Sequence, residues 1–466
     1  MKTLADYSMF DQFTARGLWW IPEEPEDKIA GEVSFSPKHI RLRLDRPFRR
    51  MIRTDFASVI GHDEVVRLPV ILGSAASGED CTLRTTLATK IGSECEFAAA
   101  ELLIGAHVPE DASEQFGSAI VHYSHMEEWA YAPLYEGLFD KTASKRGYFF
   151  PVEAQDLVTI DGAPPFARLV FFAARQHHLR RTKFEVTMHS LLDAQFASPS
   201  SIRQVRSAID LLSGLLTLLV GEAVCVKKLR LKSVSACSST VEVFFRQRRQ
   251  EPTLEFGHDM AIQLSDVRGY ASLLIQKWLN EEARLRSVYN LLLGTIRNPD
   301  LYVQSVFLSL MQALESFHRI IFGGYYDLPA SYDKVRRVLS DAIPAEASND
   351  LRNKLRTSLE YGNHFSLRRR LNELIAKLSQ DAKGLLLEEG NAEKFVSRLV
   401  DTRNYLTHYD EKSAPEVIEL SNDTLRMLNL NKRLRGFMTA LLFQYFGLPD
   451  QLASRFLSPS NLHLAQ

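Results

Sequence analysis

The spacing of apolar residues changes once along this chain, and that change limits the fold more than any other feature. Up to about residue 250, short alternating or β-branched runs are separated by clusters of Gly, Pro, Asp and Ser, which is typical of antiparallel strands. From about Ser265 onward, apolar residues recur at helical spacing. The switch predicts an α+β chain of two domains, a β-rich domain over 1–255 followed by an all-α helical bundle over 265–455.

In the first half, alternation predicts strands that expose one face and bury the other. Ile40, Leu42 and Leu44 share one such face. One helix interrupts the strands after Ser198-Pro-Ser-Ser, where apolar residues recur from Ile202 to Leu216, and we expect it to pack on the sheet. The predicted strands lie at 40–44, 67–72, 167–172, 223–231 and 240–245.

The second half carries helical periodicity with few interruptions, and it shows no internal repeat. Apolar stripes and start signals such as Asn298-Pro299 define the helices. The predicted helices lie at 265–278, 281–293, 300–322, 332–342, 348–359, 366–378, 392–407 and 414–446.

Composition narrows the function classes. The 466 residues carry a formal net charge of -1, so a chain-wide basic field for gripping long nucleic acid is missing and any RNA contact must come from local clusters. The longest apolar stretch, 211–226, is interrupted by two glycines and Glu222, which argues against a membrane span. Four scattered cysteines with no CxxC pair favour reduced thiols. We therefore expect a cytoplasmic protein without a membrane segment.

The segment from Phe395 to His408 holds the polar residues best suited to chemistry. Arg403, Asn404 and His408 fall outside its predicted apolar face: at about 100° per residue, Asn404 lies roughly 100° round the helix from Arg403, and His408 roughly 40° beyond Asn404. All three therefore share one polar arc. The residues predicted to point inward are Phe395, Leu399, Thr402 and Leu406.

These residue types suit metal-independent cleavage of RNA. An imidazole can move a proton near neutral pH. A guanidinium can neutralise the charge of a phosphorane, and an amide can orient both groups. The spacing suits a single phosphate.

The order Arg403-Asn404-x-x-x-His408 late in a helical bundle resembles the RNxxxH form of the HEPN superfamily signature. Three further segments resemble the HEPN domain of the ApeA anti-phage family, and together they cover about 265–450. In the first half, Gly17-Leu-Trp-Trp-Ile-Pro22, 30–35 and the strand 40–44 are similar to the amino-terminal domain of that family. The three HEPN-like segments are Leu308–His318, Ser366–Leu371 and Phe443–Gly447.

The resemblance implies a mechanism. HEPN domains dimerise so that two Arg/His pairs face one cleft, and a ribose 2′-hydroxyl attacks the adjacent phosphate to leave a cyclic phosphate, with no metal or other cofactor. His408 would then act as general base or acid, Arg403 would stabilise the transition-state charge, and Asn404 would position one of them. By family analogy, Glu315 would orient Arg403.

The resemblance also implies a biological setting. The helical domain would cut cellular RNA in abortive infection, with tRNA as a target common in this superfamily, and the β-rich domain would restrain it until a phage component is sensed. Two alternatives stay open. The HEPN domain could be a non-catalytic module that binds RNA or a nucleotide, or the chain could be the toxin of a toxin–antitoxin pair.

The motif residues also have purely structural interpretations. Arg403 could pair with an acidic side chain on a solvated helix end, with His408 serving as a cation near the carboxyl end of the helix dipole. For Glu315, the alternative is an ordinary salt bridge.

Other residues have weaker signals. Arg368, Arg369 and Arg370 are candidates for phosphate contact, although we expect one of the three to be structural. His122 with His125, and His177 with His178, lack a nearby set of cysteines or carboxylates, so no metal site is predicted. The pair Trp19-Trp20 is expected in a core or an interface.

Overall fold

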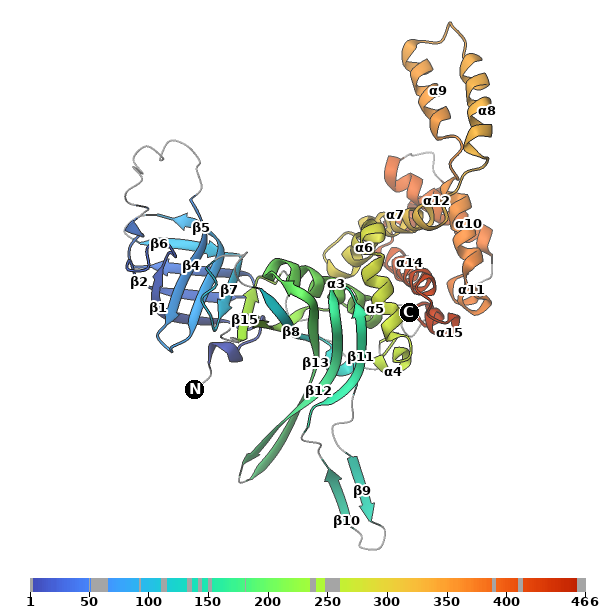
Figure 1. Cartoon of the computed structure of the whole chain (residues 1–466). Helices are drawn as coiled ribbons and strands as arrows, with labels where there is room; N and C mark the ends of the chain where they lie inside the picture. Colours follow the sequence, from blue (N-terminus) through green and yellow to red (C-terminus); the bar gives the residue numbers. More distant parts are fainter. Residues whose placement is uncertain are drawn as a thin grey trace. The chain divides into compact units, whose positions relative to one another are not determined.

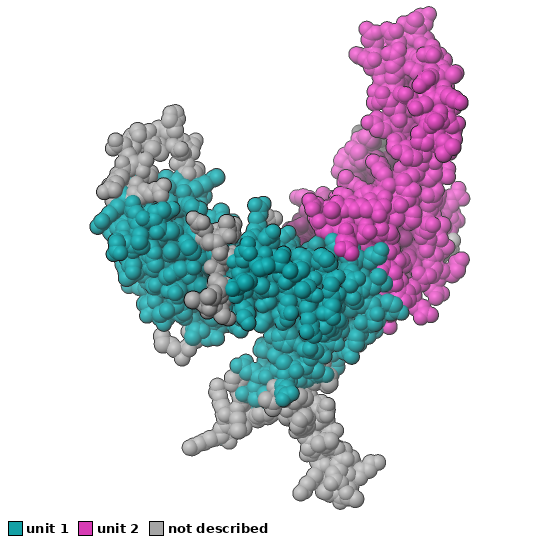
Figure 2. Space-filling model, viewed as in Figure 1, with its two compact units in different colours: residues 1–279 teal, residues 280–466 magenta. Residues whose placement is uncertain are grey.

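The computed structural model divides into two compact units, residues 1–279 and 280–466 (Figure 2). The division falls after Leu279, later than the boundary that the sequence suggests between 255 and 265. Cys237 lies outside the described residues, and Cys81 and Cys95 are buried free thiols. The structure describes residues 3–49, 51, 66–91, 94–109, 115–131, 136–140, 145–149, 153–180, 182–234, 240–247, 260–387, 391–409 and 414–458.

Unit 1 is built on an antiparallel sheet, as the alternating patterns predict (Figure 1). Its strand order is β11-β12-β13-β8-β14-β15-β7-β5-β4-β1-β2-β3-β6, while β9 (Glu136–Asp140) pairs only with β10 (Lys145–Phe149) within the described residues. The strands of the large sheet are β1 (Phe13–Trp20), β2 (Ile29–Ser36), β3 (His39–Leu44), β4 (Arg67–Ala75), β5 (Asp80–Lys90), β6 (Cys95–Ala99), β7 (Glu101–Ile104), β8 (Phe116–Tyr123), β11 (Gln155–Ala163), β12 (Phe166–Arg180), β13 (Lys183–Ser200), β14 (Val226–Ser233) and β15 (Thr240–Phe245).

One part of this sheet closes into a barrel. Strand β6 pairs with β3 on one side and with β5 on the other, so β5-β4-β1-β2-β3-β6 has no free edge. Ile40, Leu42 and Leu44 all point into its core, which confirms the face predicted from their alternation. Between the residues of β5 that pair with β7 and those that pair with β6, Thr85 adopts a φ of 53°.

Trp19 is fully buried in the barrel core, and Trp20 is also buried, as predicted. Trp19 pairs with Gly73 across β1 and β4. Its ring lies over the glycine so closely that a Cβ at Gly73 would be 2.2 Å from Trp19 Cε3. The absence of a side chain at Gly73 therefore makes room for the largest residue of the core.

The predicted interrupting helix is α3 (Ile202–Val220), and it packs against β8. Ser201 caps its first turn in a reciprocal arrangement with Gln204. Tyr123 of β8 donates a hydrogen bond of 2.8 Å to the carbonyl of Ile209. The prediction of a helix on the sheet is confirmed.

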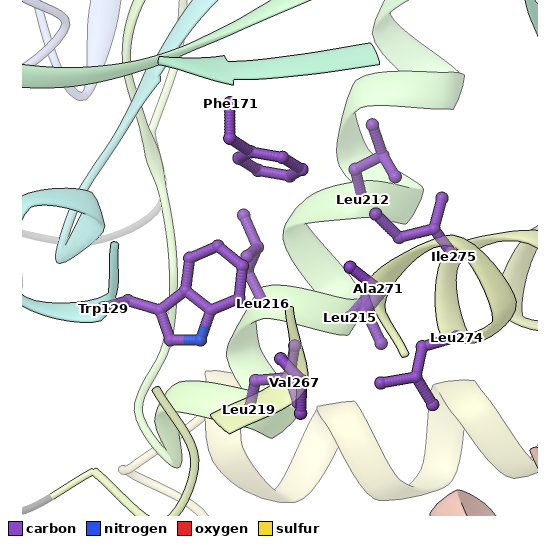
Figure 3. A pocket seen from close by; sticks show the side chains of 10 residues that line it. All are labelled: Trp129, Phe171, Leu212, Leu215, Leu216, Leu219, Val267, Ala271, Leu274 and Ile275. Atoms are coloured by element: carbon purple, nitrogen blue, oxygen red, sulfur yellow. The ribbon is translucent and has the colours of Figure 1, made fainter. Parts of the chain in front are cut away.

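A small apolar pocket lies between α3 and its neighbours (Figure 3). Trp129 of α2 (Met126–Trp129) and Phe171 of β12 face the leucines of α3 across it. Its free space of about 20 Å³ is close to that of one water molecule, and its lining is apolar. We therefore interpret it as imperfect packing, with no room for a larger ligand. The remaining lining comes from α4 (Leu264–Val267) and α5 (Ala271–Asn280).

Unit 2 is helical, which confirms the predicted change of fold class (Figure 1). Its long helices α6, α7 and α14 form the centre of the unit, with α7 in contact with both of the others. The helices are α6 (Glu282–Arg297), α7 (Val303–Phe322), α8 (Pro329–Asp341), α9 (Asn349–Tyr361), α10 (Leu367–Lys377), α11 (Gln380–Leu387), α12 (Ala392–His408), α13 (Pro415–Asn422), α14 (Thr424–Tyr445) and α15 (Asp450–Ala453).

Two of the predicted helices are interrupted in the structure. The prediction of one continuous helix over 414–446 is wrong, because α13 and α14 occupy this range. The chain leaves the helical conformation at Asp423, whose carboxylate accepts a 3.0 Å hydrogen bond from the backbone N–H of Arg426 and begins α14. Likewise, the predicted helix 265–278 is divided into α4 and α5 around Gly269. Capping by Asp423 decides the break before α14, and periodicity does not reveal it.

Helices α8 and α9 form a hairpin in which neither helix has a buried residue. The hairpin is closed at its base by hydrogen bonds between Asp327 and Asn363, at 2.9 Å in each direction.

Among the described residues of both units, no helix is long and apolar enough to cross a membrane.

The Trp19–Gly73 contact generates the first prediction. Gly73→Ala forces the Trp19 ring or the strands to move, and we expect it to lower the free energy of unfolding by about 1–3 kcal/mol. The measurement is the thermal unfolding of unit 1 within the whole chain, followed by tryptophan fluorescence. Gly269→Ala is the control, since a Cβ there meets nothing within 4 Å; equal melting temperatures for the two variants would contradict the account.

Candidate functional site on helix α12

Helix α12 presents the three motif residues in its last two turns. Asn391 caps its start by accepting a hydrogen bond of 3.0 Å from the Lys394 backbone. The helix ends at His408, after which Tyr409 takes a left-handed conformation with a φ of 50°. Its inward face is as predicted: the buried residues are Phe395, Val396, Leu399, Thr402 and Leu406.

That buried face packs against α7, α10 and α13. Because it fixes the rotation of the helix, the opposite arc is directed outward. Arg403 is half-buried, and Asn404 and His408 are exposed. The shared polar arc predicted from the spacing is therefore present in the structure.

Arg403 has an amide as its partner. Its Nη1 donates to Asn404 Oδ1 at 3.2 Å, and its backbone carbonyl accepts from Thr407 Oγ1 at 2.7 Å. Among the described residues, no carboxylate pairs with Arg403, so none of them neutralises its charge. This disfavours the structural interpretation in which Arg403 belongs to an intramolecular salt bridge.

His408 stands at the carboxyl end of α12, one turn beyond Asn404. Within the part of the chain that the structure describes, its ring makes no hydrogen bond to a side chain or to the backbone. An exposed imidazole and an unneutralised guanidinium on one arc can receive a phosphate and move a proton.

In the described part of the chain, no hydrogen bond or ion pair joins Glu315 to Arg403. Glu315 lies on α7 and accepts a hydrogen bond of 2.7 Å from Arg319, one turn later on the same helix. The expectation that Glu315 orients Arg403 is therefore replaced by the alternative, an ordinary salt bridge within a helix.

Arg368 connects α10 to the site helix. Its guanidinium donates to Ser397 Oγ and lies 3.6 Å from Asp401 Oδ1, with both partners on α12. Asp401 comes two residues before Arg403. Arg368 therefore helps to hold α12 in place, a contact that no sequence spacing signals.

Arg369 lies on the surface of α10. Its guanidinium sits 3.7 Å from the centre of the Phe365 ring and bonds to Glu373 at 3.2 Å. With Arg368, it lines an open groove along α10 together with Ser366, Asn372, Glu373 and Ala376. Both arginines therefore lie along an open surface of α10.

Arg370 is buried, with 1% of its surface exposed, and this corrects the expectation that it contacts RNA. Its guanidinium donates to the Gly323 carbonyl at 2.6 Å, to the Phe365 carbonyl at 3.2 Å and to His318 Nδ1 at 2.9 Å. Burial lowers the pKa of Arg370. Of the three arginines, it is the structural one.

The bond from Arg370 fixes the state of His318. An arginine only donates, so His318 Nδ1 must accept and the proton of the neutral ring sits on Nε2, which donates to Glu373 at 2.9 Å. Burial lowers the pKa of His318 despite the nearby carboxylate. No sequence spacing signals this buried network, because its members lie far apart on α7 and α10.

Comparison with known protein families covers most of the chain. Residues 14–278 match the family described as ApeA N-terminal domain 1. This chain belongs to the ApeA family. Residues 308–452 match the family described as Apea-like HEPN, and they include all of α12. No curated protein and no solved structure matches the chain significantly.

Membership confirms the resemblance drawn from the sequence. The ApeA-family chain is an anti-phage HEPN-domain protein with a strand-rich first part that contains a barrel and a helical second part. HEPN domains are generally nuclease-like.

The His318 network generates the second prediction. Because the folded pKa of His318 lies below its usual value of about 6.5, the unfolded chain binds more protons below that pH. The stability that the neutral ring contributes is complete above pH 6.5 and is lost as the pH falls towards the folded pKa, by up to about 1.4 kcal/mol per pH unit. Melting temperatures of unit 2 in the whole chain, at pH 7.5 and 5.5, measure the effect.

His318→Gln keeps a donor and an acceptor but does not titrate, so its acid sensitivity should be smaller than that of the wild type. His364→Gln is the control, as it replaces a histidine of the same unit outside the network. An identical pH dependence in the wild type and in His318→Gln would contradict the assignment.

Proposed function

We propose that this chain is an endoribonuclease that cuts RNA at the α12 motif without a metal ion. The observation that carries the proposal is the pairing of Arg403: it bonds to Asn404 at 3.2 Å and to no acid of the described chain, one turn from an exposed His408. Membership of the Apea-like HEPN family supports it.

In the proposed step, a ribose 2′-oxygen attacks the adjacent phosphorus and the bond to the 5′-oxygen breaks. The 2′-hydroxyl proton goes to a base, and the leaving 5′-oxygen receives a proton from an acid. The products are a 2′,3′-cyclic phosphate and a 5′-hydroxyl. His408 serves as one of the proton-transfer groups, and Arg403 stabilises the charge of the phosphorane, where a positioned donor contributes about 10²–10³ in rate.

A homodimer completes the site. One chain offers a single exposed imidazole on this arc, whereas general acid and general base catalysis need two proton-transfer groups. Two α12 motifs that face one cleft would supply both. A strictly monomeric active enzyme would contradict this part of the proposal.

The remaining parts of the proposal concern substrate and control. We propose cellular RNA, tRNA in particular, as the substrate, and restraint of the HEPN domain by the first unit until a phage component binds that unit. Uncontrolled cleavage of cellular RNA would be toxic, which is why restraint is expected. Arg368 and Arg369, which line the groove along α10, are the candidate RNA contacts.

The third prediction is cleavage of total cellular RNA by the purified chain in EDTA, with phage lysate as a source of the trigger. His408→Ala should reduce the rate at least about 100-fold through loss of proton transfer, and Arg403→Ala by about 10²–10³. Lys394→Ala is the control on the same helix and should cut normally. The readouts are the rate and the chemistry of the new ends.

Two outcomes would favour the alternatives. If no preparation cuts but all bind RNA, the HEPN domain is a non-catalytic binding module, and His408→Ala should still protect cells from phage. If expression of the chain alone arrests growth without any trigger, a toxin that needs a separate antitoxin is the better description.

A further inference from the structure

A cluster of three potential metal ligands lies in unit 1. His122 is on β8, Glu127 is in the first turn of α2, and His189 is on β13. Their ligand atoms all lie within 4.8 Å of one another. No metal site is predicted from His122 and His125 in the sequence, whereas the fold places His122 beside Glu127 and His189.

The fold brings the three together for local reasons. Strands β8 and β13 pair side by side (Figure 1). Both histidines lie beyond the paired residues Val121 and Leu192. At the end of β8, His125 takes a left-handed conformation with a φ of 62°, which turns the chain directly into α2. The first turn of α2 therefore returns towards the end of the strand that it follows.

Distances suit a single small cation. His122 Nε2 lies 2.7 Å from Glu127 Oε1, and His189 Nδ1 lies 3.9 Å from the same oxygen. In a tetrahedral zinc site with bonds of about 2.0–2.1 Å, neighbouring ligand atoms are about 3.3 Å apart. Each pair in the cluster is within about 1.5 Å of that separation, so small side-chain rotations would complete it.

Charge also favours a cation. Among the described residues, no lysine or arginine pairs with Glu127; its partners are the two imidazoles and the Ser190 backbone N–H, at 3.3 Å. A carboxylate oxygen and imidazole nitrogens are ligand atoms that zinc accepts in proteins.

One side of the cluster is open. The His122 side chain is 10% exposed, whereas those of Glu127 and His189 are 26% and 40% exposed. Two imidazoles and one carboxylate form the ligand set of zinc sites that keep a fourth position for water. We propose that His122, Glu127 and His189 bind one zinc ion, which joins α2 to strands β8 and β13.

This proposal is independent of the proposed ribonuclease function, because the cluster and the α12 motif belong to different units. The fourth prediction is that the whole chain, stripped with EDTA and dialysed, binds one zinc ion per chain at this cluster in titration calorimetry. Zinc at 100 times its dissociation constant should raise the melting temperature of unit 1 by about 5 °C or more.

His189→Ala and Glu127→Gln should each weaken zinc binding at least about 100-fold and remove the thermal shift. Glu127→Gln keeps an oxygen that can accept from Ser190, so it guards against loss of folding, which circular dichroism checks. His39→Ala, which removes an exposed histidine of the same unit, should bind zinc as the wild type does.

Unchanged zinc stoichiometry and affinity in both ligand variants, or no zinc binding by a folded wild type, would overturn the proposal and leave the cluster as a hydrogen-bonded network. The EDTA of the cleavage assay would also empty this site. The variant His189→Ala lacks a proposed zinc ligand but keeps the α12 motif. Its cleavage of RNA without EDTA therefore separates failure of the zinc site from failure of the ribonuclease proposal.

Discussion

The packing of one helix face decides what the second unit can do. Phe395, Val396, Leu399, Thr402 and Leu406 are buried against α7, α10 and α13, and they fix α12 so that its polar arc is directed outward. A rotation of this helix by one residue, about 100°, would move Arg403 towards the core. The chemistry of the α12 motif therefore depends on apolar residues that take no part in it. Arg368 reinforces the same placement from α10 through Ser397 and Asp401.

Periodicity was sufficient to predict this arrangement within α12, because a helix has a fixed rotation per residue. It also gave the barrel strand that carries Ile40, Leu42 and Leu44, since alternation defines the buried face of a strand. Periodicity failed where side chains compete with the helix backbone. Asp423 caps a new helix in the middle of an apparently continuous pattern, and nothing in the spacing distinguishes it from an exposed helical residue.

Long-range contacts were the other gap. The partners of His318 and Arg370 could not be read from the sequence, because they depend on which helices become neighbours. The three-residue cluster in unit 1 shows the same limit. His122 and Glu127 are close in sequence, but His189 is brought to them only by the pairing of β13 with β8. Contacts between charged groups on elements that are distant in sequence can be identified only from the folded structure.

The central claim is that the α12 motif promotes attack by the ribose 2′-hydroxyl, and removal of that hydroxyl tests it most directly. Once the cleaved RNA and its scissile position are mapped, the same RNA is synthesised with one 2′-deoxynucleotide on the 5′ side of the scissile phosphate. The account predicts that this position resists cleavage, because the nucleophile is missing, while other sites in the RNA are cut as before. Cleavage there at an undiminished rate would show that water or another nucleophile attacks, and it would contradict the mechanism.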